Sequence, residues 1–183
     1  MRNLVLAIAA TAGATSILFL LLRRHREAAG PVAHVENGFE FTVHAPLRRA
    51  AVLFGGSGER AWGGGRWNPR FLYPQPERDQ PGEVFTVAHG HVRSTWVNTA
   101  FDLDAGHLQY VYVVPDVQAA IIDVHLAPKD ESSASVRVLY RRTALDPAQN
   151  DHVTELGRHD RDSGKQWEAA IEEHLRSGVL AAP

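Results

Sequence analysis

The sequence contains no cysteine among its 183 residues. That absence excludes disulfide bonds, thiolate zinc sites, iron–sulfur clusters and cysteine nucleophiles together. The chain also lacks an excess of charge of either sign, with a formal net charge of −2 and an isoelectric point near 6.5. Since a protein that collects nucleic acid non-specifically needs a basic field, we expect no nucleic-acid partner.

One stretch near the amino terminus lacks charged residues altogether. Residues 4–22 form 19 consecutive uncharged positions, and as a helix they would span about 28 Å, close to the hydrocarbon thickness of about 30 Å. Bulky residues stand where a signal-peptide cleavage site needs small ones, so we expect an uncleaved single-pass anchor, with a cleaved signal peptide as the alternative. Arg23, Arg24 and Arg26 outnumber Arg2 on the other side, which favours a soluble domain in the cytoplasm.

We therefore divide the chain into an anchor and linker over residues 1–29 and a soluble α+β domain over residues 30–183. Short turn-like connections join five consecutive strand-like runs, which predicts antiparallel hairpins. A strand and a short helix precede them, followed by a glycine-rich loop and a proline-rich segment that we expect to be irregular. One long helix is expected to end the domain, and the helical spacing of Val153 and Leu156 allows it to begin well before Trp167. The predicted strands cover about residues 34–45, 84–90, 94–104, 108–115, 119–128 and 133–145, and the predicted helices cover 47–54 and 167–178.

The glycine-rich loop superficially resembles a nucleotide-binding motif. Residues 56–61 match G-x-G-x-x-G/A, but that motif requires a helix to begin at once inside a βαβ unit. Here WGGGRWNP follows, and consecutive glycines cost about 1 kcal/mol each in a helix relative to alanine. We therefore reject a dinucleotide or phosphate site.

The same loop carries a family resemblance. GERAWGGGRWNP, residues 58–69, resembles the G-E-R-x-W-x-x-x-W-x-P element of small bacterial members of the START-like superfamily, also called SRPBCC or helix-grip proteins. It differs by one extra glycine between the two tryptophans. The resemblance covers about residues 35–175 and implies an antiparallel sheet of about seven strands that grips a long C-terminal helix around an apolar cavity. It also implies hydrophobic ligands, and some members are cyclases, dehydratases or hydrolases, but the superfamily has no common catalytic set to carry over. We expect no cofactor.

The aromatic residues of the loop and of the later elements are candidate walls for an apolar ligand. Glu59 and Arg60, with Gly58, are interpreted as structural residues of the loop. In the alternative interpretation, the tryptophans are a structural plug that closes the end of the sheet. The predicted ligand-binding residues are Trp62, Trp67, Phe71, Tyr73, Tyr110, Tyr112 and Trp167.

Several polar residues allow a catalytic or a structural interpretation. Asp123 and His125 alternate with apolar residues, so they are solvent-exposed if the apolar face meets the helix, and an acid–base dyad in the cavity if the register is reversed. His89 and His91 lie two apart, as metal ligands can, but we expect solvated strand-end histidines and no metal. Arg141, Arg142 and the run HDRDSGK, residues 159–165, are expected to be solvated edges.

These features predict a membrane-anchored domain that binds a hydrophobic small molecule, such as a lipid, an isoprenoid or a polyketide-like compound, between sheet and helix. A cyclase, dehydratase or hydrolase is the first alternative, and it requires at least two of the acidic, histidine and tyrosine candidates to face the cavity. A filled-core interaction module is the second alternative, and it requires large side chains to occupy the grip.

Overall fold

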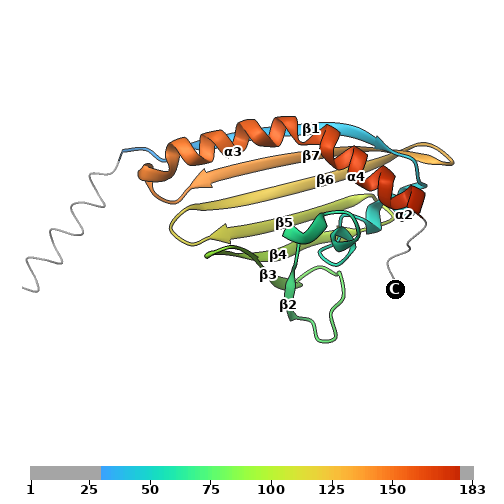
Figure 1. The fold of residues 1–183 in the computed structure, drawn as a ribbon, viewed down its shortest axis with the longest axis horizontal. Coiled ribbons are helices and arrows are strands. Elements are labelled where there is room, and N and C mark those ends of the chain that lie inside the picture. The colour runs from blue at the N-terminus through green and yellow to red at the C-terminus, as the bar shows by residue number, and fades with distance from the viewer. Residues whose placement is uncertain (1–29, 178–183) are drawn as a thin grey trace, which may run out of the picture. The chain divides into compact units, whose positions relative to one another are not determined.

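The computed structural model describes residues 30–177 (Figure 1). The predicted anchor at residues 4–22 and the expected helix stop at Gly178 lie outside the described residues. Within residues 30–177, no helix is long and apolar enough to cross a membrane.

Seven strands in the described part of the chain form one curved antiparallel sheet in the order β1-β7-β6-β5-β4-β3-β2 (Figure 1). From β3 onward each strand pairs with its sequence neighbour, as the short connections predicted. The first strand instead pairs with the last, placing Phe41 opposite Val136. The strands are β1 (His34–Val43), β2 (Arg70–Tyr73), β3 (Val84–His89), β4 (Val92–Asp102), β5 (His107–Val114), β6 (Gln118–Asp130) and β7 (Ser133–Ala144).

Strand β2 corrects the expectation that the whole proline-rich segment is irregular. It spans four residues at the edge of the sheet and pairs only with β3, with a register shift between Phe71 and Tyr73. Prolines on either side limit its length because a proline has no N–H for the ladder. So short a strand offers no readable alternation in the sequence.

Three helices pack on the sheet, and two of them replace the single long C-terminal helix that the sequence predicted. They are α2 (Leu47–Val52), α3 (Asn150–Asp162) and α4 (Gly164–Ser177). Helix α3 runs along β1 and β7, and α4 continues in a new direction toward α2 (Figure 1). Short 3₁₀ turns occur at η1 (Gly58–Ala61), η2 (Gly64–Arg66) and η3 (Pro147–Gln149).

The break between α3 and α4 has a local cause at Ser163. Its hydroxyl donates to the His159 carbonyl at 2.9 Å, a back-bond that bends helices. The next residue, Gly164, lies directly against Phe39, since a Cβ at that position would be 3.1 Å from the Phe39 Cβ. The chain therefore changes direction where it also packs directly against β1.

The strands alternate as their sequences predicted. Ile122, Val124 and Leu126 of β6 are buried on the face that meets the helices, together with Val136 and Val138 of β7. Each such side chain contributes about 1.5–3 kcal/mol when fully buried. This register puts Asp123 and His125 on the opposite face of the sheet, away from the core.

Candidate functional site

A cavity of about 90 Å³ lies between the sheet, α4 and the loop that follows α2. Strands β4 to β7 supply one wall, and the opposite wall comes from α4 and the glycine-rich loop. Six aromatic rings, two aliphatic side chains and one carboxyl group line it. The lining residues are Phe54, Glu59, Trp67, Trp96, Tyr110, Ile122, Val124, Tyr140 and Trp167.

The cavity is small for a ligand-binding protein. Typical ligand pockets begin at about 300 Å³, and an engineered apolar cavity of about 150 Å³ binds benzene. By the same ratio of volume to atoms, this cavity takes about four non-hydrogen atoms without rearrangement. The large side chains around the cavity fill most of the volume between the sheet and α4, but they leave this space open.

Hydrogen bonds donated by their indole N–H groups hold Trp62, Trp67 and Trp96 in place. The Trp62 indole donates to the Leu53 carbonyl at 2.7 Å, and the Trp67 indole donates to the Gly56 carbonyl at 2.9 Å. The Trp96 indole donates to the Ser94 hydroxyl at 2.8 Å. Because these donors are already used, Trp67 and Trp96 present ring surface to the cavity and not hydrogen-bond donors.

Glu59 brings the one carboxyl group into the cavity wall. Its backbone is fixed in η1, where its N–H donates to the Gly55 carbonyl at 2.9 Å and its carbonyl accepts from Gly63 at 2.7 Å. Its carboxyl has neither a hydrogen bond nor an ion pair with any other residue that the structure describes. Burial without a partner raises the pKa of Glu59 to about 8, so the group is largely neutral at pH 7.

Two tyrosines of the wall differ in how their hydroxyls are used. The Tyr110 hydroxyl donates to the Phe54 carbonyl at 3.2 Å and accepts from the Asn98 amide at 3.3 Å. The Tyr140 hydroxyl has no hydrogen-bond partner within residues 30–177. Burial raises the pKa of both phenols, and the Glu59 carboxyl adds to the rise in each, which places that carboxyl near both rings.

A second buried acid lies behind this wall. Glu83 accepts hydrogen bonds from the Gln80 N–H at 2.7 Å and from the Asn98 amide at 3.3 Å. Burial raises its pKa to about 7. Glu83 does not line the cavity, so it supports Tyr110 through Asn98.

The structure brings three of the seven predicted ligand-binding residues to the cavity: Trp67, Tyr110 and Trp167. Trp62 packs behind Trp167, with ring centroids 5.0 Å apart. Phe71 is buried against Phe85.

Tyr73 and Tyr112, also predicted as ligand-binding, do not reach the cavity. Tyr73 is 57% exposed on the edge strand β2. Tyr112 is buried behind Trp96, with centroids 4.2 Å apart, and its hydroxyl accepts from Arg142.

The loop residues divide into structural and cavity-facing groups. Arg60 forms an ion pair with Glu77 and donates to the Pro69 carbonyl, in line with its structural interpretation. A Cβ at Gly58 would fall 2.0 Å from the Val52 carbonyl, so only glycine fits there. Glu59, by contrast, combines a structural backbone with a side chain in the cavity wall, which the sequence interpretation missed.

Arg142 and Asp160, expected to be solvated, form a buried ion pair. Each residue is 6% exposed, and the guanidinium donates to both carboxylate oxygens at 2.5 and 2.6 Å. It also donates to Gln118 Oε1 at 3.2 Å and lies 4.7 Å from the centroid of the Tyr140 ring. The pair fixes α3 to the sheet directly behind the cavity wall.

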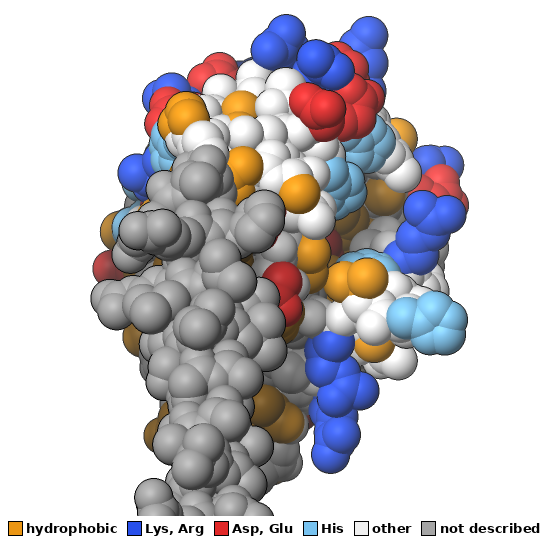
Figure 2. Space-filling model, turned by 90° about the vertical axis from the view of Figure 1, so that its left-hand side faces the viewer, with side chains coloured by type: hydrophobic (Ala, Val, Ile, Leu, Met, Phe, Trp, Pro, Cys, Tyr) orange, Lys and Arg blue, Asp and Glu red, His pale blue; other side chains and the backbone are white. Residues whose placement is uncertain are grey.

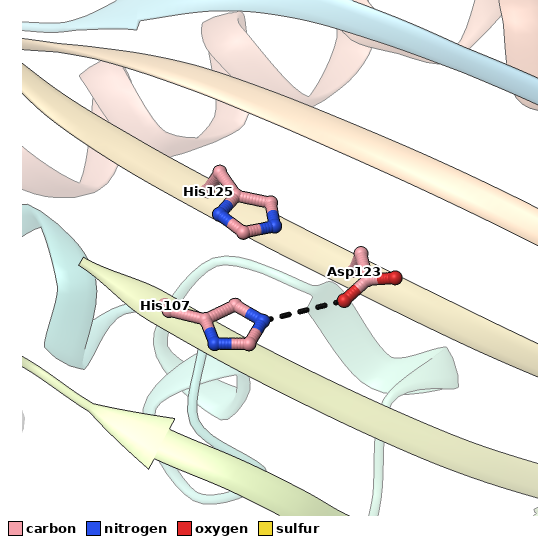
Figure 3. Close-up of side chains that lie close together, drawn as sticks. All are labelled: His107, Asp123 and His125. Atoms are coloured by element: carbon pink, nitrogen blue, oxygen red, sulfur yellow. Dashed lines mark hydrogen bonds and ion pairs between the residues drawn. The ribbon is translucent and has the colours of Figure 1, made fainter. Parts of the chain in front are cut away.

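A polar cluster occupies the outer face of the sheet, where His107, Asp123 and His125 lie close together (Figure 3). Their ligand atoms all lie within 4.8 Å of one another, and two imidazoles with a carboxylate are a donor set that zinc accepts. The two rings stack with centroids 4.4 Å apart. The cluster comes from cross-strand neighbours, because His107 pairs with His125 in the ladder between β5 and β6.

The protein already satisfies the carboxylate of this cluster. Asp123 Oδ1 accepts from the Gln109 amide at 2.7 Å and lies 3.3 Å from the His107 ring, and Oδ2 accepts from Arg141. Burial raises the pKa of Asp123, but these hydrogen bonds and the charge of Arg141 outweigh it and lower the pKa overall. A metal ion would compete with a guanidinium there, so the cluster is better explained as a polar contact between strands.

The structure thus corrects the expectation for one member of the pair Asp123 and His125. His125 is exposed, as predicted for the outer face, whereas Asp123 is buried there by its partners. Neither reaches the cavity. His89 and His91 are both exposed at the turn between β3 and β4, in line with the interpretation as solvated strand-end histidines.

One end of the domain shows no broad patch of one kind. Charged side chains of both signs and scattered hydrophobic side chains share its described surface (Figure 2). The candidate site is therefore the internal cavity.

Comparisons with known proteins find similarity to this chain only among solved structures, in the fold. No protein-family model matches it, and no curated protein does. Among solved structures, the Zhui aromatase/cyclase from Streptomyces sp. R1128 superimposes with a TM-score of 0.60 at 15% identity, over 81% of this chain and 98% of that one. A truncated norcoclaurine synthase from Thalictrum flavum gives 0.58 at 11% identity, over 84% and 98%. A protein from Thermobifida fusca gives 0.57 at 16% identity, over 80% and 97%.

Identities this low establish architecture and leave activity open. These structures share the fold of the described residues, an antiparallel sheet with helices packed on it, which agrees with the fold that the G-E-R-x-W resemblance implied. Residues 30–177 therefore have a helix-grip fold.

Proposed function

We propose that the domain binds a compact, largely apolar small molecule in the aromatic cavity. The observation that carries this proposal is the partly open cavity of about 90 Å³ with six aromatic rings and a single carboxyl group in its wall. Burial of apolar surface at about 25 cal/mol per Å² would supply most of the affinity. The solved norcoclaurine synthase in complex with dopamine and hydroxybenzaldehyde gives indirect support, since that protein holds aromatic compounds on the same fold.

The cavity volume narrows the class of ligand that the sequence suggested. A lipid, an isoprenoid or a polyketide-like compound has many more than the four or so atoms that fit. Such a ligand would enter only if Trp167 moved with α4, or if the loop that holds Trp67 moved. Our proposal is therefore a compact ligand, with a larger hydrophobic ligand admitted only after rearrangement.

Residues 4–22 are proposed to anchor the chain to a membrane, with the domain in the cytoplasm. The proposed anchor and its orientation rest on the 19 uncharged positions and on the three arginines that follow them. The arrangement would supply the cavity with compounds that partition into the bilayer. Alkaline carbonate extraction tests the anchor, and protease protection in vesicles tests the orientation; release by carbonate would refute the anchor.

Tryptophan fluorescence tests ligand binding directly, because the four tryptophans of the chain all line the cavity or contact a residue that does. Full-length protein in amphipol would be titrated with 1-propanol and 2-propanol, which match the volume of the cavity, and with toluene, which enters only after rearrangement. We expect a saturable change. Ile122→Phe fills the cavity and should abolish it, whereas Val113→Phe adds the same ring at a position that is 37% exposed and should preserve it.

The opposite result has a defined meaning. If none of the probes changes the fluorescence, and Ile122→Phe raises the melting temperature with no effect on any ligand, then the grip is a filled core. That outcome would support an interaction module instead.

An enzymatic role is the second candidate, favoured by Glu59. A carboxyl with a pKa of about 8 exchanges protons efficiently at neutral pH, and Glu59 and Tyr110 both line the cavity, although no hydrogen bond joins them. Acetone has four non-hydrogen atoms, and NMR can follow exchange of its methyl protons in D₂O. An enzymatic Glu59 should accelerate this exchange and Glu59→Gln should not; equal rates would remove this candidate.

A further inference from the structure

The Glu59 carboxyl is the one acidic group in the cavity wall, and it has no protein partner within residues 30–177. The Tyr140 hydroxyl beside it also lacks a partner there. Once Glu59 ionises, its two oxygen atoms only accept hydrogen bonds. A cationic ligand that brings several N–H donors therefore suits the ionised carboxylate.

The rings add to this preference. The face of an aromatic ring carries negative electrostatic potential and attracts an organic cation within about 6 Å of its centroid. Six rings line the cavity around Glu59. Trp67 and Trp96 lie edge to face, with centroids 5.2 Å apart, so these two rings of the wall differ in orientation.

The charged groups around Glu59 leave its carboxyl without a resident counter-ion. Arg60, next in sequence, is held by Glu77 and the Pro69 carbonyl. Arg142, behind Tyr140, is held by both oxygens of Asp160.

The remaining titratable groups that face Glu59 are phenols and acids. Tyr110 on β5 and Tyr140 on β7 face it directly, and Glu83 and Asp79 act on Tyr110 from the far side. No histidine or lysine lines the cavity. A positive charge must therefore come from the ligand.

We propose that the cavity selects a compact alkylamine, whose ammonium group pairs with the Glu59 carboxylate among the aromatic rings. This inference rests on the proposed function, because it names the ligand class for the same cavity. On binding, the neutral carboxyl group loses its proton to solvent, and the ammonium group keeps all three of its own and donates them to the oxygen atoms of the wall. One ligand thus enters as one proton leaves.

Ionising Glu59 at pH 7 reduces affinity only modestly. With a pKa of about 8, about nine-tenths of the groups are protonated at pH 7, so ionisation lowers the apparent affinity about tenfold. A charge-assisted hydrogen bond together with several ring faces exceeds that factor. A carboxylate ligand gains neither contribution and is repelled once Glu59 ionises.

The test compares ligands of one shape and different charge. Full-length protein in amphipol is titrated at pH 7 with propylamine, 1-propanol and propionate, read by tryptophan fluorescence, with butylamine and benzylamine to probe for expansion of the cavity. We expect the amine to bind at least tenfold more tightly than the alcohol, and propionate not to bind. In weakly buffered solution with a pH indicator, amine binding should release about 0.9 proton per site, and alcohol binding none.

Two isosteric variants locate the effect. Glu59→Gln should lose the preference for the amine and the proton release, but keep its affinity for the alcohol, which shows that the cavity is intact. Glu131→Gln removes an exposed acid that does not line the cavity and should keep both properties. Circular dichroism confirms that each variant is folded.

The outcomes separate this inference from the proposed function. Equal binding of amine and alcohol, or an amine preference that persists in Glu59→Gln, overturns the amine inference while the cavity remains a binding site. Absence of any saturable change with all five probes overturns both.

Discussion

Replacing Asp160 by asparagine should destabilise the domain strongly, because it leaves the Arg142 charge buried without a counter-ion. The substitution keeps the size of the side chain and removes its charge. Arg142 would retain only neutral partners, the Tyr112 hydroxyl and Gln118 Oε1. Both members of the pair are 6% exposed, so water cannot replace the lost carboxylate.

The magnitude follows from the two hydrogen bonds that are changed. The guanidinium donates to the carboxylate at 2.5 and 2.6 Å, and hydrogen bonds to charged groups contribute about 1.5–3 kcal/mol each. Breaking a buried pair costs about 3–5 kcal/mol. Asparagine still accepts one of the two bonds, so we expect the lower end, about 3 kcal/mol, and a fall in melting temperature of about 6–12 °C.

Urea unfolding followed by circular dichroism measures this change. The matched control is Asp162→Asn, an exposed acid on the same helix, for which we expect a change within about 0.5 kcal/mol. Arg142→Met combined with Asp160→Leu removes both charges and should recover much of the loss. A loss below about 1 kcal/mol for Asp160→Asn would show that solvent screens the pair and would refute the reasoning.

Three further predictions concern pH and close packing. Because Glu59 has a pKa of about 8 in the folded state against 4.5 ordinarily, its contribution to stability should be largest below pH 4.5 and fall by up to about 4 kcal/mol between pH 4.5 and 8; between these pH values, urea unfolding should show a smaller fall for Glu59→Gln, and identical pH profiles would contradict this. Gly164→Ala should lower the free energy of unfolding by about 1–3 kcal/mol, since the new methyl group would lie 3.1 Å from the Phe39 Cβ; an unchanged melting temperature would show that Phe39 can move. Asp130 has a pKa lowered to about 2, with the hydrogen bond from Ser133 as the largest cause, so an NMR titration should find a higher value in Ser133→Ala, and no change would assign the shift to other groups.

The order of the sheet could be read from the sequence because its causes are local. Short connections fix consecutive strands as antiparallel neighbours, and the alternation around Ile122 and Val124 identified the inward face of β6. The helix over residues 47–54 was predicted from apolar spacing, and α2 occupies Leu47–Val52. The pairing of β1 with β7 joins segments about a hundred residues apart and came only through the family resemblance.

The buried charges could not be predicted because their partners are distant in sequence. Arg142 and Asp160 each stand in a run of charged residues, which ordinarily indicates a solvated surface. Only the packing of α3 over β7 brings them together. Asp123 is a similar case, since it is buried by Gln109, Arg141 and His107 on the face that the alternation assigned to solvent.

An aromatic cavity was predicted from the sequence, but only some of the residues that line it were. The aromatic loop indicated a wall, and Trp67 does line the space. Tyr140 and Trp96 were missed because alternation along a strand does not show which inward side chain meets a void and which meets another side chain. Glu59 was missed because the turn uses its backbone, and a sequence pattern does not separate a residue's backbone role from that of its side chain.

The break at Ser163 divides what would otherwise be one continuous helix into two segments with different contacts. Helix α3 is clamped to the sheet by the pair of Arg142 and Asp160, whereas α4 carries Trp167 over the cavity. A continuous helix would transmit any displacement of Trp167 directly to that clamp. Because the helix is interrupted at Ser163, a ligand that displaced Trp167 and α4 would not have to disturb the pair of Arg142 and Asp160. The volume open to a ligand would then be set separately from the contact that holds α3 to the sheet.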